Sequence, residues 1–300
     1  MSYPNSGANL TSSLKVDSME NMNLPVNQRN ERDRRDLKDL WSRSLSLALP
    51  IFLLIMWELV YRLNPSSGVV VSAPSLISRE FFRLVGSGEL IIHSAHSLSL
   101  ILGALALSSA LAIPLGVAMG AKDLFYRLLD PVVELIRPIP PLALLPLAIV
   151  WLGIGSAEKL FILCVGTFPP IVLNTIHGVR SADPVQIRAA RSMAATDRDV
   201  LVKVLIPSAL PHMLIGLRIA VGFAFTVIVA AELVATRNGL GYLLTIGWRT
   251  YNLETIFVSI LTIGLLAYGL EVALRLATKR LVKWQPEHLA PLGLLRSDRP

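Results

Sequence analysis

The sequence has little of what disulfide-stabilised, metal-dependent and nucleotide-binding proteins require. Its single cysteine, Cys164, excludes an internal disulfide and a cluster of cysteine metal ligands. The five histidines show no His-Glu-x-x-His spacing, so the sequence predicts no metal site. The glycine-rich stretch 237–242 lacks the Gly-x-x-x-x-Gly-Lys pattern of a phosphate loop. We therefore expect a non-catalytic chain that binds no ATP and no other cofactor by itself.

Charge is scarce as well. Charged residues make up 16% of the 300-residue chain against 53% hydrophobic residues, and the mean hydropathy is +0.58. This composition is too apolar for an ordinary soluble domain. The net charge of +7 could suggest nucleic acid, but the basic residues lie in separate short loops between apolar runs. That pattern is typical of membrane topology, so we expect a lipid bilayer as partner and no nucleic acid.

Six apolar segments predict an all-α integral membrane protein with six transmembrane helices. They lie at about 44–61, 97–121, 132–152, 159–175, 213–234 and 255–274. Basic residues concentrate between the fourth and fifth segments and after the sixth, which places both termini in the cytoplasm. An amphipathic piece at 76–85 is expected at the outer surface.

The predicted domain organisation follows from these segments. Residues 1–40 are polar, with no apolar period, and are expected to form a disordered cytoplasmic tail. Residues 41–284 form the transmembrane domain, which includes a cytoplasmic loop at 181–211, and residues 285–300 form a cytoplasmic C-terminal tail.

The third segment is broken by prolines, among them Pro138, Pro140 and Pro141. Prolines at membrane depth are tolerated where neighbours satisfy the freed carbonyl groups or where the backbone faces a cavity. We therefore expect this segment to line a pathway. The second segment instead carries small residues, including Gly103, Ser108 and Gly116, which permit close helix contact.

Ionisable groups near membrane depth add to the candidate pathway. The full candidate set is Arg137, Pro140, Pro141, Arg218 and Glu232. Arg218 could contact an anion or could extend its charged end to the inner interface. It stands 14 residues from Glu232 on one predicted helix, so these two side chains cannot pair with each other. The role of Glu232 stays open.

The loop at 181–211 carries two helix-start signatures. The first is Asp183 as N-cap, followed by Pro184 and Gln186. The second is Thr196, with Asp199 three residues later. The sequence predicts two short amphipathic helices joined at 194–195, the second stopped by Pro207 and Pro211. A helix pair of this kind at a membrane surface suits docking into a groove of another protein.

This loop resembles the "EAA" loop of the permease subunits of ATP-binding-cassette (ABC) importers. Ala189-Ala190 fill the two alanine positions, Ala194 stands at the glycine position, and 204–207 closes the motif. Arg188 replaces the family's glutamate, so the contact of that glutamate with the ATPase subunit is not transferred to Arg188. Where the glycine would adopt a left-handed conformation, an alanine costs about 1 kcal/mol.

Other stretches are similar to the taurine, sulfonate and nitrate branch of these permeases, and to taurine permeases most of all. These stretches are Arg137–Gly155, Asn174–Arg180, Ala230–Leu233 and Leu270–Trp284. The resemblance implies a type I ABC importer permease fold in a bacterial inner membrane. It further implies a homodimer, two cytoplasmic ATP-binding subunits that carry ATP and Mg²⁺, and a periplasmic or surface-anchored solute-binding protein. The residues expected to couple to the ATPase are Arg188, Ala189, Ala190, Met193, Ala194, Ala195, Val204 and Pro207.

The substrate implied by the resemblance is taurine or another sulfonate, with nitrate, bicarbonate and a pyrimidine precursor as alternatives within the same class. The alternative from a different class is a secondary carrier or a membrane-embedded enzyme, and the enzyme would need a clustered nucleophile and base or metal ligands, which the sequence does not show. Such a carrier usually shows a membrane-centre carboxylate relay and two matching halves. Neither feature is visible in the sequence, which favours the importer.

Overall fold

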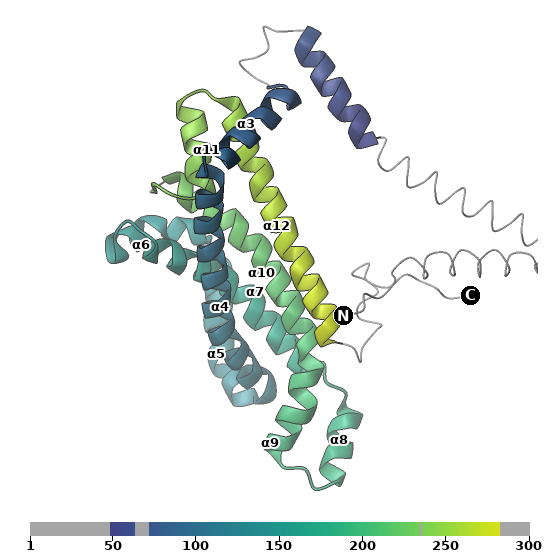
Figure 1. The fold of residues 1–300 in the computed structure, drawn as a ribbon. Helices are drawn as coiled ribbons and strands as arrows, with labels where there is room; N and C mark the ends of the chain where they lie inside the picture. Colours follow the sequence, from purple (N-terminus) through teal and green to yellow (C-terminus); the bar gives the residue numbers. More distant parts are fainter. Residues whose placement is uncertain (1–48, 64–71, 235, 283–300) are drawn as a thin grey trace, which may run out of the picture. The chain divides into compact units, whose positions relative to one another are not determined.

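The computed structural model describes residues 49–63, 72–234 and 236–282, in which all regular elements are helical (Figure 1). The chain divides into two units, Met1–Pro74 and Ser75–Pro300. The first unit contains the helix at 49–63, and the second contains the helices described below. The two predicted tails, 1–40 and 285–300, and the start of the first predicted span lie outside the described residues.

The centre of the larger unit is built from α4 (Glu89–Ala121), α7 (Ala157–Arg180) and α10 (Ile206–Val234). Helix α7 packs against both α4 and α10 (Figure 1). A Cβ atom on Gly116 would lie 2.7 Å from Cβ of Thr175, and one on Gly120 would lie 2.6 Å from Cβ of Val179. Small residues on α4 therefore set its close approach to α7, as predicted from the second apolar segment.

The third predicted span is bent, as the prolines indicated. It consists of α5 (Asp123–Ile136), the 3-10 turn η2 (Pro141–Leu144) and α6 (Leu145–Leu152), and the two parts meet at 82°. Pro138, Pro140 and Pro141 lie in or beside the break. A proline has no N–H to donate and its ring collides with the preceding turn, so a straight helix cannot continue there.

The predicted helix pair exists, but its second helix does not stop where the sequence analysis expected. Helix α8 (Pro184–Ser192) is followed by α9 (Asp197–Val200), a π-helical turn η3 (Leu201–Leu205) and then α10. The N–H of Ile206 donates to the carbonyl of Leu201, five residues back. This shift of hydrogen-bond register comes directly before Pro207. The prediction that Pro207 and Pro211 end the helix is wrong, because the helix continues through both to Val234.

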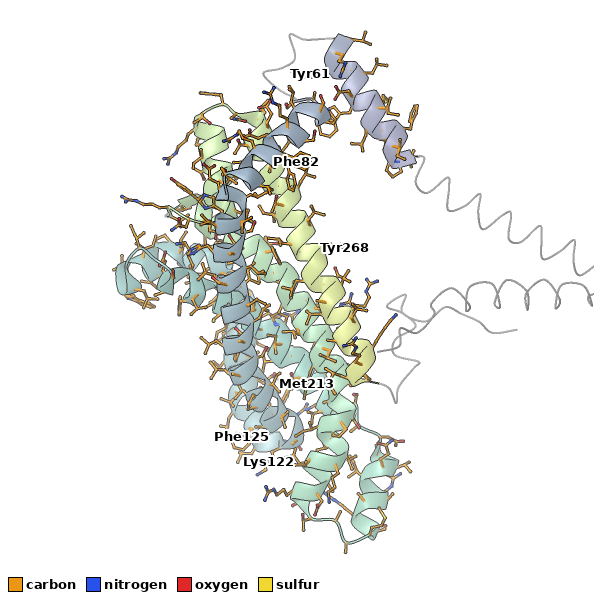
Figure 2. The ribbon with its side chains drawn as sticks, in the orientation of Figure 1. Tyr61, Phe82, Lys122, Phe125, Met213 and Tyr268 are labelled. Carbon is orange, nitrogen blue, oxygen red and sulfur yellow. The ribbon has the colours of Figure 1, made fainter. Side chains whose placement is uncertain are left out.

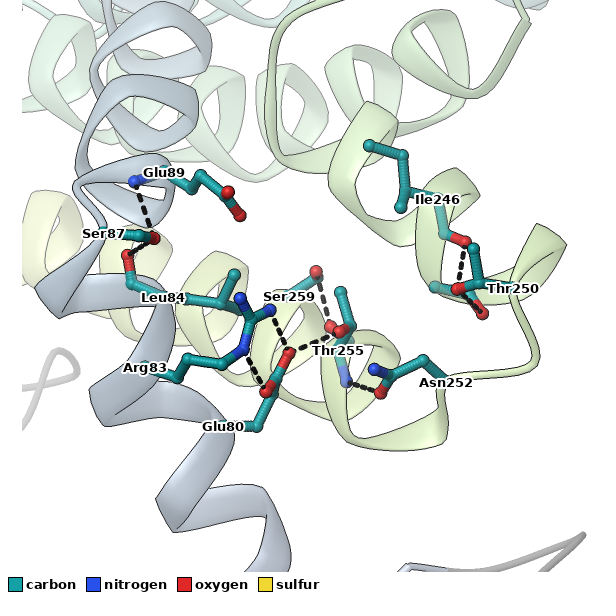
Figure 3. A network of polar contacts seen from close by, with 11 residues as sticks. Glu80, Arg83, Leu84, Ser87, Glu89, Ile246, Thr250, Asn252, Thr255 and Ser259 are labelled. Carbon is teal, nitrogen blue, oxygen red and sulfur yellow. Dashed lines mark hydrogen bonds and ion pairs between the residues drawn. The ribbon is translucent and has the colours of Figure 1, made fainter.

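Three helices lie at the end of the bundle opposite α8 and α9: α3 (Pro74–Gly86), α11 (Leu240–Arg249) and the start of α12 (Leu253–Leu281) (Figure 1). Figure 3 shows how α3 and α12 are joined. Glu80 forms an ion pair with Arg83 and accepts a 2.8 Å hydrogen bond from the Thr255 hydroxyl, and Asn252 caps α12 through the Thr255 N–H. The predicted amphipathic piece at 76–85 is therefore a helix fastened to the bundle.

Four of the described helices are long and apolar enough to cross a membrane: α4, α7, the continuous α9–α10 segment and α12. The bent pair of α5 with η2–α6 would make a fifth. Large apolar side chains remain exposed on the outside of the unit, such as Phe82 on α3 and Tyr268 on α12 (Figure 2). A lipid environment accounts for such exposure. The count of six spans and the cytoplasmic location of both termini stay predictions.

Candidate functional site

The turn between α8 and α9 is a complete Schellman motif built around an alanine. The Ala195 N–H donates to the carbonyl of Ala190 at 3.1 Å, and the Ala194 N–H donates to that of Arg191 at 3.0 Å. Ala194 has a φ of 58°, in the left-handed region that favours glycine. The end of α8 is therefore a left-handed helix end, and it is occupied by a residue that is strained in that conformation.

Both predicted helix starts are present. Asp183 accepts a 2.7 Å hydrogen bond from the Val185 N–H at the start of α8. Thr196 and Asp199 form a reciprocal capping box at the start of α9, and Lys203 donates to Asp199 at 2.7 Å. These hydrogen bonds, that of Lys203 foremost, lower the pKa of Asp199 to about 2. The loop is thus a defined pair of helices rather than an irregular connection.

The helix pair exposes much of the predicted coupling surface. Arg188, Ala189, Met193 and Ala194 are exposed, and Met193 is 79% exposed. The other predicted coupling residues are half-buried: Ala190, Ala195, Val204 and Pro207. An exposed methionine at a helix end is an adaptable apolar anchor for a protein partner. The surface is therefore suited to docking with another protein.

A cavity of about 510 Å³ lies where the α5–η2 bend meets α7 and α10. The predicted pathway residues Arg137 and Pro141 both line it, while Pro140, Arg218 and Glu232 do not. Asn174 and the Pro169-Pro170 pair of α7 also line it, together with Phe223 of α10. The sequence analysis missed these residues, although two adjacent prolines within an apolar run were a visible signal.

Arg218 is paired rather than free. Its guanidinium donates to Glu271 of α12 at 2.6 Å, and Arg275 lies 3.7 Å from the same carboxylate. The contact joins α10 to α12. Because Glu271 already satisfies one side of the guanidinium, the structure favours a helix-pairing role over anion contact.

Glu232 belongs to a buried set of hydrogen bonds that we call the α11 latch: His93, Ser97 and Glu232 together with the N–H groups of residues 239–241. The N–H groups of Gly239, Leu240 and Gly241 donate to His93 Nδ1, Ser97 Oγ and Glu232 Oε2 at 3.1, 2.9 and 2.8 Å. The Ser97 hydroxyl in turn donates to Glu232 Oε1 at 2.7 Å.

In the latch, side chains from α4 and α10 accept hydrogen bonds from the backbone N–H groups at the start of α11. The first N–H groups of a helix lack intrahelical partners, and a carboxylate is favourable there. Gly239 has a φ of 119°, and a Cβ on it would collide with the Glu232 carboxylate. The Gly-Leu-Gly sequence and Glu232 therefore fit each other. The sequence analysis identified both but did not connect them, because the contact joins helices far apart in the chain.

A buried charged pair, Glu158 and Lys159, opens α7 and was also missed. The two side chains are 0% and 2% exposed, and Lys159 Nζ lies 3.4 Å from Glu158 Oε1. In the sequence, Lys159 stood out only as the first residue of the fourth apolar segment. Within the described ranges, no three His, Cys, Asp or Glu side chains are grouped so that they could hold a metal ion.

Comparison with known proteins agrees with these features. The family model described as "binding-protein-dependent transport system inner membrane component" matches residues 112–284. The taurine transport system permease protein TauC of Escherichia coli is 36% identical over 262 residues, which cover 84% of this chain and 95% of that protein. A putative ABC transporter permease of Methanocaldococcus jannaschii is 36% identical over 80% of this chain and 92% of its own.

Solved structures show the same fold. A chain of the methionine ABC transporter MetNI, in an inward-facing conformation, has a TM-score of 0.54 at 23% identity, covering 65% of this chain and 95% of that one. An amino acid ABC transporter has a TM-score of 0.53 at 18% identity, covering 68% and 97%. The expected ABC importer permease fold is confirmed.

Proposed function

Since the chain belongs to the family of binding-protein-dependent transport system inner membrane components, we propose that it moves a small sulfonate, taurine foremost, through a bacterial inner membrane. Subunits of this family are permeases of ABC importers and not enzymes. The family also implies ATP-binding and solute-binding partners. The secondary-carrier alternative is left without support.

The sulfonate assignment rests on similarity and on one feature of the structure. The taurine permease TauC is 36% identical, and permeases for aliphatic sulfonates from Escherichia coli and Bacillus subtilis are 30% and 29% identical. The supporting feature is Arg137 at the 510 Å³ cavity of the proline bend. A guanidinium matches the oxygen geometry of sulfonates and carboxylates.

The proposed mechanism uses two copies of this chain and two cytoplasmic subunits that hold ATP and Mg²⁺. ATP-driven closure of those subunits would move α8 and α9 through contacts at Met193 and Ala189. Because α9 continues through η3 into α10, the motion would pass directly to a wall of the cavity. The helices would rock as rigid bodies and expose the cavity to the other side.

Reconstitution tests this proposal. The complete importer is placed in proteoliposomes with its solute-binding protein, and ATP hydrolysis and uptake are measured with taurine, nitrate, bicarbonate and riboflavin. Riboflavin is included because the riboflavin permease RibX of Chloroflexus aurantiacus is 31% identical. We expect taurine to stimulate both activities. Stimulation by a different solute alone would reject the sulfonate assignment, and uptake independent of ATP would reject the importer.

A further inference from the structure

A polar cavity of about 550 Å³ lies at the end of the bundle away from α8 and α9. Three parts of the chain form it: His96 of α4, the turn and first residues of α7, and the loop between α10 and α11. Its lining residues are His96, Ile154, Gly155, Ser156, Lys159, Thr236, Arg237 and Asn238. Its volume is within the range of small-molecule sites, and it is distinct from the cavity at Arg137.

The charged side chains that line this cavity are basic. Lys159 contributes a buried ammonium and Arg237 an exposed guanidinium, with the imidazole of His96 beside them. No carboxylate belongs to its lining among the described residues. Such an arrangement is favourable for an anion and unfavourable for a cation.

Contacts with Gly155 and Glu158 hold the Lys159 side chain in place. Its Nζ donates to the carbonyl of Gly155 at 2.6 Å and lies 3.4 Å from Glu158 Oε1. Glu158 is itself fixed, since its Oε2 accepts a 2.7 Å hydrogen bond from the Gly155 N–H. An ammonium has three protons, and the hydrogen bond to the Gly155 carbonyl uses one of them. The ion pair with Glu158 at 3.4 Å offsets part of the lysine charge without a hydrogen bond, so donors remain for a ligand.

The opposite wall leads directly into the α11 latch. Thr236 Oγ1 donates to the Asn238 carbonyl at 2.8 Å, which folds the loop on itself, and Gly239 follows immediately. An anion held between Lys159 and Arg237 would therefore join α7 to the loop that positions α11.

We propose that this cavity is a receiving site for the anionic group, a sulfonate or carboxylate, of the solute entering from outside. This inference rests on the proposed function, which supplies the inward direction of transport and the solute. Lys159 and Arg237 would make the first contact with the anionic group. Arg137, deeper along the pathway, would make a later contact with the same anionic group.

The test uses the permease–ATPase complex in nanodiscs of zwitterionic lipid, so that no anionic headgroup competes. Thermal unfolding is followed against methanesulfonate and, at equal ionic strength, methylammonium. We expect a saturable rise in Tm with methanesulfonate only. In uptake assays Arg237→Gln should raise the KM for the solute about tenfold with kcat nearly unchanged. The matched control is Arg249→Gln, an exposed arginine of α11 outside the cavity.

Several results would overturn the proposal. These are no saturable shift with methanesulfonate, equal effects of Arg237→Gln and Arg249→Gln, or loss of the shift when anionic lipid is added. If taurine uptake proceeds while no anion shifts Tm, the proposed function stands and this site falls. If acetate or bicarbonate replaces methanesulfonate in both assays, the site stands and the sulfonate assignment falls.

Discussion

Ala194 shows how a single residue departs from the rule for its position. Its φ of 58° belongs to the left-handed region, and the two Schellman hydrogen bonds of the α8 end require that conformation. An L-residue with a Cβ is strained there by about 1–2 kcal/mol. The turn between α8 and α9 therefore stores strain at Ala194, the residue that the sequence analysis aligned with the glycine of the permease loop.

Ala194→Gly should stabilise this turn by about 0.5–1 kcal/mol, because strain relief exceeds the added chain entropy of glycine. Hydrogen exchange of the Ala194 and Ala195 amides, which make the two bonds, measures the effect and should slow. Ala190→Gly is the control with the opposite sign. Ala190 lies within α8, where a glycine in place of alanine destabilises the helix by about 1 kcal/mol. In this variant the Ala194 and Ala195 amides should therefore exchange faster. Faster exchange in Ala194→Gly would contradict the explanation.

Glu232 is the acceptor on which the α11 latch depends. Glu232→Ala removes the partner of the buried Gly241 N–H and of the Ser97 hydroxyl, at a cost of about 1–3 kcal/mol for each group left unsatisfied. We expect rapid hydrogen exchange at residues 239–241 and a lower Tm. The control is Thr226→Ala on the same helix, whose exposed hydroxyl bonds only its own helix at Gly222. Equal destabilisation by the two variants would reject the latch.

At the scale of elements, the start of α9 is held by the capping box. Thr196→Ala should destabilise that start by about 1 kcal/mol, detected as faster exchange of the Asp199 amide. The pKa of Asp199 is lowered to about 2 from its ordinary 3.8, so its stabilising effect is complete above pH 4 and is lost as pH falls towards 2. Nuclear magnetic resonance of the Asp199 carboxyl should show no titration between pH 8 and 4. A midpoint near 4 would contradict this assignment.

The close packing of α4 against α7 requires a glycine at position 116 but not at position 103. Gly116→Ala would bring a Cβ within 2.7 Å of the Thr175 Cβ and 3.0 Å of the Val172 carbonyl, forcing the helices apart at about 1–3 kcal/mol. Gly103→Ala is the matched control, because the nearest atom, in Leu160, is 3.6 Å away. We expect the first change to lower Tm by several degrees and the second to leave it unchanged or raise it. Equal tolerance of both would contradict the packing described.

At the scale of the whole molecule, the proposed function requires a route from the ATPase to the pathway. Met193 is 79% exposed at the tip of the helix pair, and Met193→Asp should leave folding intact while abolishing solute-stimulated ATP hydrolysis. The control is Leu281→Asp, an exposed apolar residue at the end of α12 and outside the helix pair. If Met193→Asp retains full stimulation in the reconstituted importer, α8 is not the coupling element.

The class of the protein and much of its local structure could be predicted from the sequence alone. Apolar segments with their basic flanks gave the membrane helices, prolines gave the bend between α5 and η2, and capping residues gave the starts of α8 and α9. These features depend on residues close together in the chain, so composition and spacing reveal them. The motifs that are similar to those of taurine permeases likewise indicated the family.

The contacts between residues far apart in the chain could not be predicted from the sequence and came from the folded structure. It paired Arg218 with Glu271, placed Glu232 at the start of α11, and buried Lys159 beside a polar cavity. It also carried α10 through Pro207 and Pro211, because the π turn and the packing of the bundle outweigh the usual effect of proline. Periodicity along one helix cannot show which neighbour each face contacts, and contacts between helices decide what a buried polar side chain does.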